Sequence, residues 1–97
     1  MSVTAIGRAP CGKPERYVQQ LVSHWSHKMA ATWDAGRAKF PFSESTHAVM
    51  DTSPEGVTIS LTTATAEENE HMRGVIERHL DRFAFREAPL SYEWTQQ

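Results

Sequence analysis

The segment Gly56–Thr63 constrains the fold more than any other part of the chain, because its residues alternate between apolar and hydroxyl side chains. The apolar members are Val57, Ile59 and Leu61, and the hydroxyl members are Thr58, Ser60 and Thr62. A period of two is the pattern of a β-strand with one buried face. Together with the preceding turn over residues 53–56 and the extended segment 47–51, it predicts an antiparallel hairpin.

A helix start follows this strand directly. Thr65 and Glu68 have the spacing of a capping box, and Glu67 and Glu68 place negative charge in the first turn. Beyond them, apolar residues recur at three- and four-residue steps, namely Met72, Val75, Ile76, Leu80 and Phe83. We expect an amphipathic helix that ends between Phe85 and Pro89. The acidic run 67–70 is interpreted as the start and solvated face of this helix rather than as a metal site.

A first helix is predicted to begin at Pro14, since proline is tolerated in a first turn, where its missing N–H needs no partner. The apolar stripe of this helix extends as far as Met29. Its members are Tyr17, Val18, Leu21, Val22, Trp25 and Met29. A stripe with this spacing must face another apolar surface, and we expect that surface to be a sheet.

Short extended segments account for the rest of the chain. They are residues 3–5, ending near Gly7 before a loop over 8–12, and residues 31–34, 37–42 and 90–94. Because Pro41 cannot donate a hydrogen bond to a neighbouring strand, segment 37–42 is either at a sheet edge or bulged at Pro41, and we favour the edge. The element order is β-α-β-β-β-β-α-β, which predicts an α+β two-layer sandwich with a mostly antiparallel sheet and two helices on one face.

Length and charge limit the classes of function. The 97 residues predict one domain, residues 1–97. Ten Lys and Arg against twelve Asp and Glu give a formal charge of −2, without the basic excess that argues for a nucleic-acid partner. No apolar run matches a signal peptide or a membrane span, so we expect a cytoplasmic protein without membrane contact. The lone Cys11 is interpreted as a bystander thiol in a loop, and a nucleophile role would need a positioned histidine.

Three histidines are candidates for chemistry. His24 and His27 are three residues apart, a helical spacing at which two imidazoles can reach one metal ion, although no third ligand accompanies them. His79 lies within the apolar stripe of the second helix, so we expect it to be partly buried, either as a hydrogen-bonded structural group or as an acid/base. Two helices packed side by side could bring His24 and His79 together.

Two arginines are candidates for anion binding. Arg82 and Arg86 are predicted to lie one turn apart on the second helix, where they could frame an anion. Asp81 and Glu87 are their neighbours in sequence, and solvated ion pairs with these carboxylates are the simpler expectation.

Four segments resemble the bacterial family called domain of unknown function 2218. They are residues 20–28, 36–42, 79–87 and 92–95, and the matching residues in the two helices are His24, Trp25, His27, Lys28, His79, Arg82, Phe83 and Arg86. The resemblance implies a stand-alone domain of about this length, or one found beside siderophore-interacting, iron-uptake proteins, with no assigned reaction.

Three hypotheses of function follow. The first is a non-enzymatic accessory or binding module, which the resemblance connects with iron and siderophore handling. The second is a small enzyme with His79 or His24 as acid/base, although the sequence has no Gly-rich phosphate loop, nucleophile elbow or metalloprotease motif. The third is a homodimer that pairs through residues 40–42. No cofactor is evident, and the candidate ligand residues are His24, Lys28, His79, Arg82 and Arg86.

Overall fold

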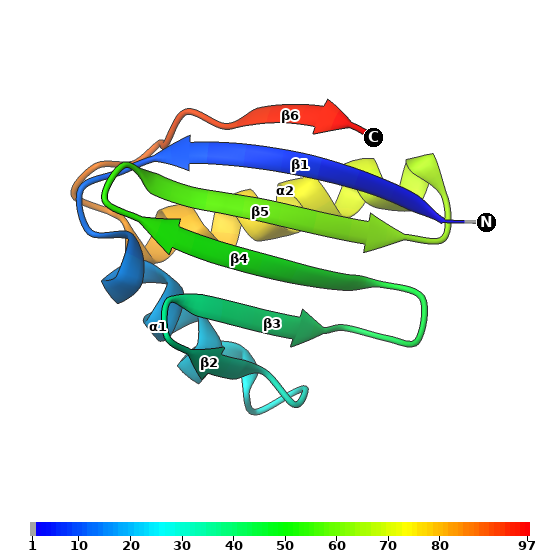
Figure 1. The fold of residues 1–97 in the computed structure, drawn as a ribbon, viewed down its shortest axis with the longest axis horizontal. Helices are drawn as coiled ribbons and strands as arrows, with labels where there is room; N and C mark the ends of the chain where they lie inside the picture. Colours follow the sequence, from blue (N-terminus) through cyan, green and yellow to red (C-terminus); the bar gives the residue numbers. More distant parts are fainter. Residues whose placement is uncertain (1) are drawn as a thin grey trace.

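In the computed structural model, which describes residues 2–97, six strands form one antiparallel sheet and two helices pack on it. The strands are β1 (Val3–Pro10), β2 (Thr32–Asp34), β3 (Arg37–Pro41), β4 (His47–Ser53), β5 (Gly56–Thr63) and β6 (Glu93–Gln96), and the helices are α1 (Pro14–Trp25) and α2 (Ala66–Phe83). The strand order across the sheet is β2-β3-β4-β5-β1-β6 (Figure 1). The predicted α+β class and element order are confirmed.

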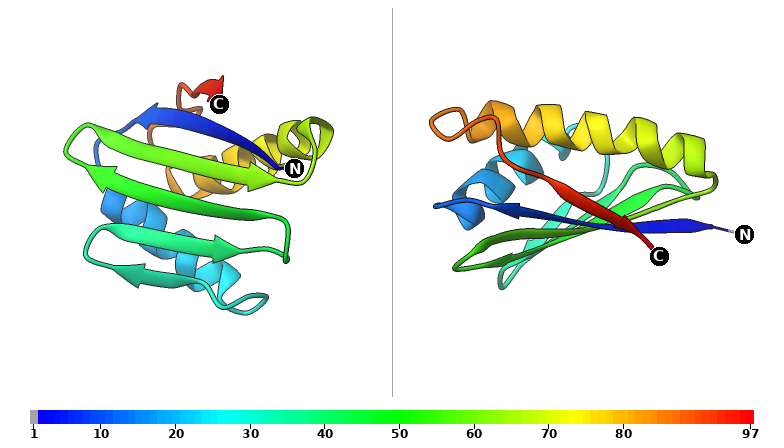
Figure 2. Two further views of the ribbon diagram at one scale, coloured as in Figure 1. Left: turned by 45° about the vertical axis from the view of Figure 1, so that its right-hand side comes forward. Right: turned by 90° about the horizontal axis from the view of Figure 1, so that it is seen from above.

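Both helices cover the same face of the sheet, and the opposite face is open (Figure 2). α1 packs on β2, β3 and β4, whereas α2 packs on β5 and β1, and the two helices also contact each other. This arrangement follows from the sequence pattern, because an alternating strand offers one apolar face and each amphipathic helix needs one.

The core lies between the helices and the sheet. From β5 it takes every second side chain, Val57, Ile59, Leu61 and Thr63. From α1 it takes Tyr17, Val18, Leu21 and Trp25, and from α2 Ile76 and Leu80. The indole of Trp25 is 3% exposed and meets the rings of Phe40 and Phe42 edge-on, at centroid distances of 5.3 and 4.9 Å. The predicted stripe of α1 is therefore the centre of an aromatic cluster.

β1 is longer than predicted. It continues to Pro10, so the loop expected over residues 8–12 begins only at Cys11. The pairing of Ala9 with Val57 and of Pro10 with Gly56 carries the strand this far. Gly56 has φ of +151°, and a Cβ atom there would lie 2.3 Å from the Ala9 carbonyl oxygen. The close approach of the two strands thus requires a glycine at this position.

The helix ends also differ from the prediction. α1 ends at Trp25 rather than continuing to Met29, and the amides of Lys28 and Met29 both donate to the Trp25 carbonyl in a tight turn. Met29 still packs on the core from this turn, although it lies beyond the end of the helix. α2 ends at Phe83, two residues before the predicted range.

The closing strand is shorter than predicted. β6 begins at Glu93, so Leu90 and Tyr92 precede it. Both are fastened to α2 instead, because the Asp81 carboxylate accepts hydrogen bonds from the Leu90 amide (3.2 Å) and the Tyr92 hydroxyl (2.8 Å). Side-chain contacts with the helix, rather than a ladder with β1, hold this part of the segment.

The prediction that residues 37–42 form an edge strand is wrong. β2 pairs with β3 along Arg37, Ala38 and Lys39. Pro41 lies beyond the last of these pairs, so β2 does not need a hydrogen bond from it. The edges of the sheet are β2 and β6. The hypothesis of a dimer that pairs through residues 40–42 stays a prediction, because Phe40 and Pro41 pair with β4 on one side and lie beyond the β2 pairs on the other.

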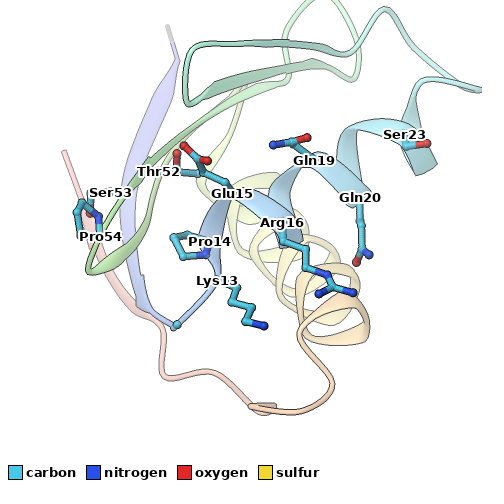
Figure 3. Close-up of a pocket in the computed structure, with 11 residues that line it drawn as sticks. Lys13, Pro14, Glu15, Arg16, Gln19, Gln20, Ser23, Thr52, Ser53 and Pro54 are labelled. Carbon is cyan, nitrogen blue, oxygen red and sulfur yellow. The ribbon is translucent and has the colours of Figure 1, made fainter.

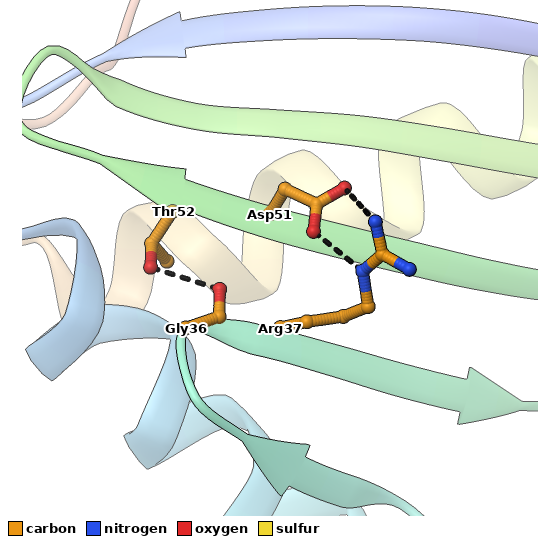
Figure 4. A network of polar contacts seen from close by, with 4 residues as sticks. All are labelled: Gly36, Arg37, Asp51 and Thr52. Atoms are coloured by element: carbon orange, nitrogen blue, oxygen red, sulfur yellow. Dashed lines mark hydrogen bonds and ion pairs between the residues drawn. The ribbon is translucent and has the colours of Figure 1, made fainter.

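Two polar contacts link β4 to β3 and to the turn that precedes β3. Arg37 donates to Asp51 through Nε (2.6 Å) and Nη2 (3.4 Å), and the Thr52 hydroxyl donates to the Gly36 carbonyl at 2.9 Å (Figure 4). Within residues 2–97, Arg37 and Asp51 form the only ion pair closer than 4 Å. Both side chains are about half exposed, so the pair contributes at most about 1 kcal/mol.

Candidate functional site

The line where α1 meets α2 brings the predicted histidines together. The ring centroids of His24 and His79 are 5.6 Å apart, and Phe83 lies 5.7 Å from His24. His79 also packs on Trp25 at 4.9 Å. Both imidazoles are partly buried. The juxtaposition expected from the two helical patterns is thus present in the structure.

Each of the two histidines has a defined environment. The Nδ1 atom of His79 lies 2.7 Å from the Val75 carbonyl oxygen, and because a carbonyl only accepts, Nδ1 carries the proton of this hydrogen bond. In the neutral tautomer with this hydrogen bond, Nε2 is an acceptor. Partial burial lowers the pKa of His24, and the neighbouring His79, Arg82, Lys28 and His27 lower it further. His24 therefore favours its neutral form in the folded protein.

Two adjoining surface hollows flank this contact, and we call them together the seam groove. The hollows have volumes of about 520 and 320 Å³ and share Gln20, Phe83 and Phe85. The larger hollow is also lined by His24, His27 and Arg82, and the smaller by Lys13, Arg16, Tyr17, Arg86 and Glu87. Phe85 is 71% exposed, the highest value for any large apolar side chain within residues 2–97.

The cations of the seam groove are not neutralised by the carboxylates expected to pair with them. Asp81 is occupied by Tyr92 and Leu90. Glu87 accepts hydrogen bonds from the Gly12 amide at 2.9 and 3.1 Å and from the Tyr17 hydroxyl. The predicted ion pairs with Arg82 and Arg86 are absent from the described part of the chain. The hydrogen bonds of Asp81 and Glu87 explain this absence, because both carboxylates are bound to donors in other segments.

Arg82 and Arg86 do not lie one turn apart on a helix, because α2 ends between them at Phe83. The guanidinium carbon of Arg86 lies 5.8 Å from the centroid of the Phe85 ring, in cation–π contact. Each arginine lines a different hollow of the seam groove. The structure therefore brings both to the same groove, but to different hollows of it.

The geometry assumed for the metal pair is also wrong, because α1 ends before His27. That residue and Lys28 are exposed in the turn that follows Trp25. No cluster of three or more His, Cys, Asp or Glu side chains suited to a metal ion occurs in residues 2–97. Binding of a metal by His24 and His27 stays a prediction, and these two histidines would be its only protein ligands among the described residues.

Cys11 lies in the loop between β1 and α1, as expected, and its side chain is buried. Burial raises the pKa of its thiol, and the negative charge of Glu87 raises it further, against a smaller opposing effect of the Lys13 backbone. The neutral thiol is therefore favoured, which disfavours a nucleophile at this position because the thiolate is the reactive form.

A larger and more polar hollow, of about 860 Å³, extends over the outer side of α1 to the turn between β4 and β5. Figure 3 shows Lys13, Arg16 and Gln20 pointing to one side of α1, and Glu15 and Gln19 pointing to the other. The first three also line the smaller part of the seam groove or both parts of it. The basic side of α1 thus continues into the groove.

Sequence reasoning missed Lys13, Arg16 and Phe85 as members of the site. Lys13 and Arg16 flank the start of α1, and Phe85 lies beyond the end of α2, so no single periodic pattern joins them. The one available signal was Phe85 itself, an aromatic residue placed off the stripe of α2. Only the packing of the two helices makes neighbours of these residues.

The comparisons with known proteins concern the fold and the family. No curated protein matches the sequence. A solved structure with a similar fold is the NMR structure of PA4090 from Pseudomonas aeruginosa, with a TM-score of 0.77 and 24% identity over 98% of this chain and 96% of that one. Residues 6–95 match the family described as "Uncharacterized protein conserved in bacteria (DUF2218)". The resemblance noted in the two helices is therefore confirmed, and the chain belongs to the DUF2218 family of bacterial proteins.

Proposed function

We propose that this protein is a binding module that takes a small anionic ligand in the seam groove. The observation that carries the proposal is the set of cations left without carboxylate partners around the groove. Four side chains of this kind, of the ten Lys and Arg, are exposed and line the groove: Lys13, Arg16, Arg82 and Arg86. Their charge is local, because the whole chain has a formal charge of −2.

The physical reasoning rests on where the carboxylates are used. An arginine next to Asp or Glu in sequence is commonly neutralised by it, at little gain in stability. Here Asp81 and Glu87 are already hydrogen-bonded to Tyr92 and Tyr17, so Arg82 and Arg86 keep free donors beside a concave surface. Guanidinium groups bind carboxylates, sulfonates and phosphates through paired N–H donors. An anion is the ligand class that these groups recognise best.

The groove supports binding better than catalysis. His79 is held by the Val75 carbonyl and packs on Trp25, as a structural imidazole does. A general base needs its acceptor nitrogen within reach of a substrate, and His24 is the histidine of this pair that lines the hollow. An acid/base role for His24 is the second candidate function, and turnover of a bound ligand would favour it.

The family resemblance suggests which physiological anions to try first. It links such domains with siderophore-interacting proteins, and ferric catecholate siderophores are anions that carry aromatic rings. We include this ligand class in the proposal because cations and phenyl rings line the same groove.

No helix within residues 2–97 is long and apolar enough to cross a membrane.

The test is a calorimetric titration of the purified protein with benzenesulfonate at low ionic strength, accompanied by native mass spectrometry with ferric siderophores. We expect binding that Arg82→Gln weakens by about fivefold, the effect of about 1 kcal/mol. Arg78→Gln is the matched control, since it removes the same charge from the exposed side of α2 without lining the groove. Equal losses in both variants would show attraction by net charge alone and would contradict a site in the groove.

A further inference from the structure

Phe85 belongs to both hollows of the seam groove, and each hollow has cations of its own. Phe83 and Gln20 also line both hollows. The larger hollow adds Arg82 and the histidines His24 and His27. The smaller hollow adds Lys13, Arg16 and Arg86. An aromatic ring that is 71% exposed is therefore shared by two hollows that carry separate hydrogen-bond donors.

Each of the two hollows has a net positive charge when histidines are counted as neutral. The larger hollow carries only Arg82, so its charge is +1. The smaller hollow carries three cations, Lys13, Arg16 and Arg86, and one carboxylate, Glu87, so 3 − 1 gives +2. The carboxylate is engaged with Gly12 and Tyr17 and faces donors of its own. Each part can thus attract one anionic group.

The apolar centre adds a second requirement for the ligand. Most of the Phe85 side chain is exposed to solvent, and Phe83 lines the same two hollows. Burial of such a surface is favourable by about 25 cal/mol for each Å² of apolar area, and aromatic rings stack on one another with additional gain. A flat aromatic body covers this surface better than a flexible chain does, because less conformational freedom is lost.

We infer that the ligand of the seam groove is an aromatic dianion, whose ring system lies on Phe85 and whose two anionic groups lie one in each hollow. This inference rests on the proposed function and narrows it to a ligand class. Arg82 binds one anionic group, and Arg86, which stacks on Phe85 at 5.8 Å, binds the other together with Arg16. The Phe85 ring orients the ligand between them.

The experiment compares three kinds of probe by calorimetry at constant ionic strength: naphthalene monosulfonate, the isomers of naphthalene disulfonate, and an alkane disulfonate of similar length. All stay fully ionised near neutral pH. We expect the best disulfonate isomer to bind at least about tenfold more tightly than the monosulfonate, the effect of one additional charge-assisted contact. The alkane disulfonate should bind about fivefold more weakly than that isomer, because it cannot stack.

Variants assign the parts of the ligand to the parts of the groove. Arg82→Gln should reduce the affinity for the disulfonate to that for the monosulfonate, because its hollow has no other Lys or Arg. Arg86→Gln should weaken the disulfonate by a smaller factor, because Lys13 and Arg16 remain in its hollow. Phe85→Leu should weaken the naphthalene probes while leaving the alkane disulfonate unchanged. Melting curves confirm that each variant is folded. All three residues lie at the surface or half-exposed ends of elements, so their substitution leaves the core intact.

The outcomes separate the two proposals. If no disulfonate isomer binds more tightly than the monosulfonate, the dianion inference is wrong, although binding of the monosulfonate would still support an anion site. If the alkane disulfonate matches the naphthalene isomers, the aromatic part of the inference is wrong. If none of the probes binds, the proposed function is wrong and the inference falls with it.

Discussion

The two helices lie side by side on the same sheet but are held there by different means. α1 buries Tyr17, Val18, Leu21 and Trp25 within twelve residues. α2 has eighteen residues, yet its fully buried side chains are Asn69, Ile76 and Leu80. α2 adds polar contacts, through Glu77 to the Trp94 indole and through Asp81 to the Tyr92 hydroxyl. Hydrophobic burial secures α1, whereas α2 also depends on hydrogen bonds to the C-terminal segment.

This difference explains why the site lies where it does. Because the polar groups of α2 face Tyr92, Trp94 and the edge of the sheet, its carboxylates are drawn away from the seam with α1. Arg82 near the end of α2 and Arg86 just beyond it remain at the seam, where Lys13, which precedes α1, and Arg16 of α1 also lie. The hydrogen bonds of α2 to the C-terminal segment thus leave the side of α2 that faces α1 positively charged.

The largest expected effect is on the α1 side of this comparison. Trp25→Ala should lower the free energy of unfolding by about 3 to 5 kcal/mol, because it empties the aromatic cluster formed with Phe40, Phe42 and His79. Denaturant unfolding gives the value. Phe85→Ala is the matched control, since it removes an aromatic ring that is 71% exposed and should change stability by less than about 0.5 kcal/mol. Similar losses in the two variants would contradict the assignment of Trp25 to the core.

A smaller effect is expected on the α2 side. Asn69 is fully buried and donates to the Val3 and Leu61 carbonyls at 3.3 and 3.2 Å, while its own carbonyl accepts from Arg73 at 2.8 Å. Asn69→Ala should cost about 1 to 3 kcal/mol, because these buried partners lose their hydrogen bonds.

Glu70→Ala is the control for Asn69, since it removes the neighbouring, exposed side chain. We expect a change within about 0.5 kcal/mol for this variant, measured by the same unfolding curves. If Asn69→Ala is as mild as the control, polar contacts do not hold α2, and the contrast between the two helices disappears.

The smallest effect concerns the seam itself. The folded pKa of His24 lies below its unfolded value, through partial burial first and then the neighbouring His79, Arg82, Lys28 and His27. The unfolded chain therefore binds this proton more readily, and His24 lowers stability as pH falls through about 6.5, the unfolded value. Unfolding free energies at about pH 7.5 and pH 5.5 should show a smaller loss in His24→Gln than in the wild type.

His71→Gln is the control for this measurement, because it removes an exposed imidazole from α2 away from the seam. Its loss of stability between the two pH values should equal that of the wild type. If His24→Gln loses as much unfolding free energy between the two pH values as the wild type, the folded environment of His24 does not disfavour the imidazolium.

Several features of the fold could be predicted because they depend on local pattern. The alternation in Gly56–Thr63 specified a strand with one buried face, and the Thr65 hydroxyl accepts from the Glu68 amide at 3.1 Å as a capping box predicts. The stripe of α1 was correct up to Trp25. Where the pattern misled, a different interaction prevailed. Asn69 was interpreted as part of a solvated acidic face, yet it is buried because two strand carbonyls offer it partners.

Local sequence patterns predicted only part of the candidate site. His24, His79, Arg82 and Arg86 were singled out one helix at a time, and side-by-side packing was recognised as a way to join the two histidines. The partners of Asp81 and Glu87 were not predictable, because Tyr92 and Tyr17 lie 11 and 70 residues away from them. The positive charge of the seam depends on those partners.

The sequence by itself determined the class of fold, the order of the elements and the faces that each helix buries, because these follow from residue periodicity and capping within a few positions. Tertiary structure alone decided which carboxylates are occupied, that β2 rather than β3 forms the edge, and that Phe85 lines two hollows with separate cations. The physical reason is range: propensity and amphipathicity act between near neighbours, whereas hydrogen-bond partners and surface charge are set by residues that only the folded chain brings together.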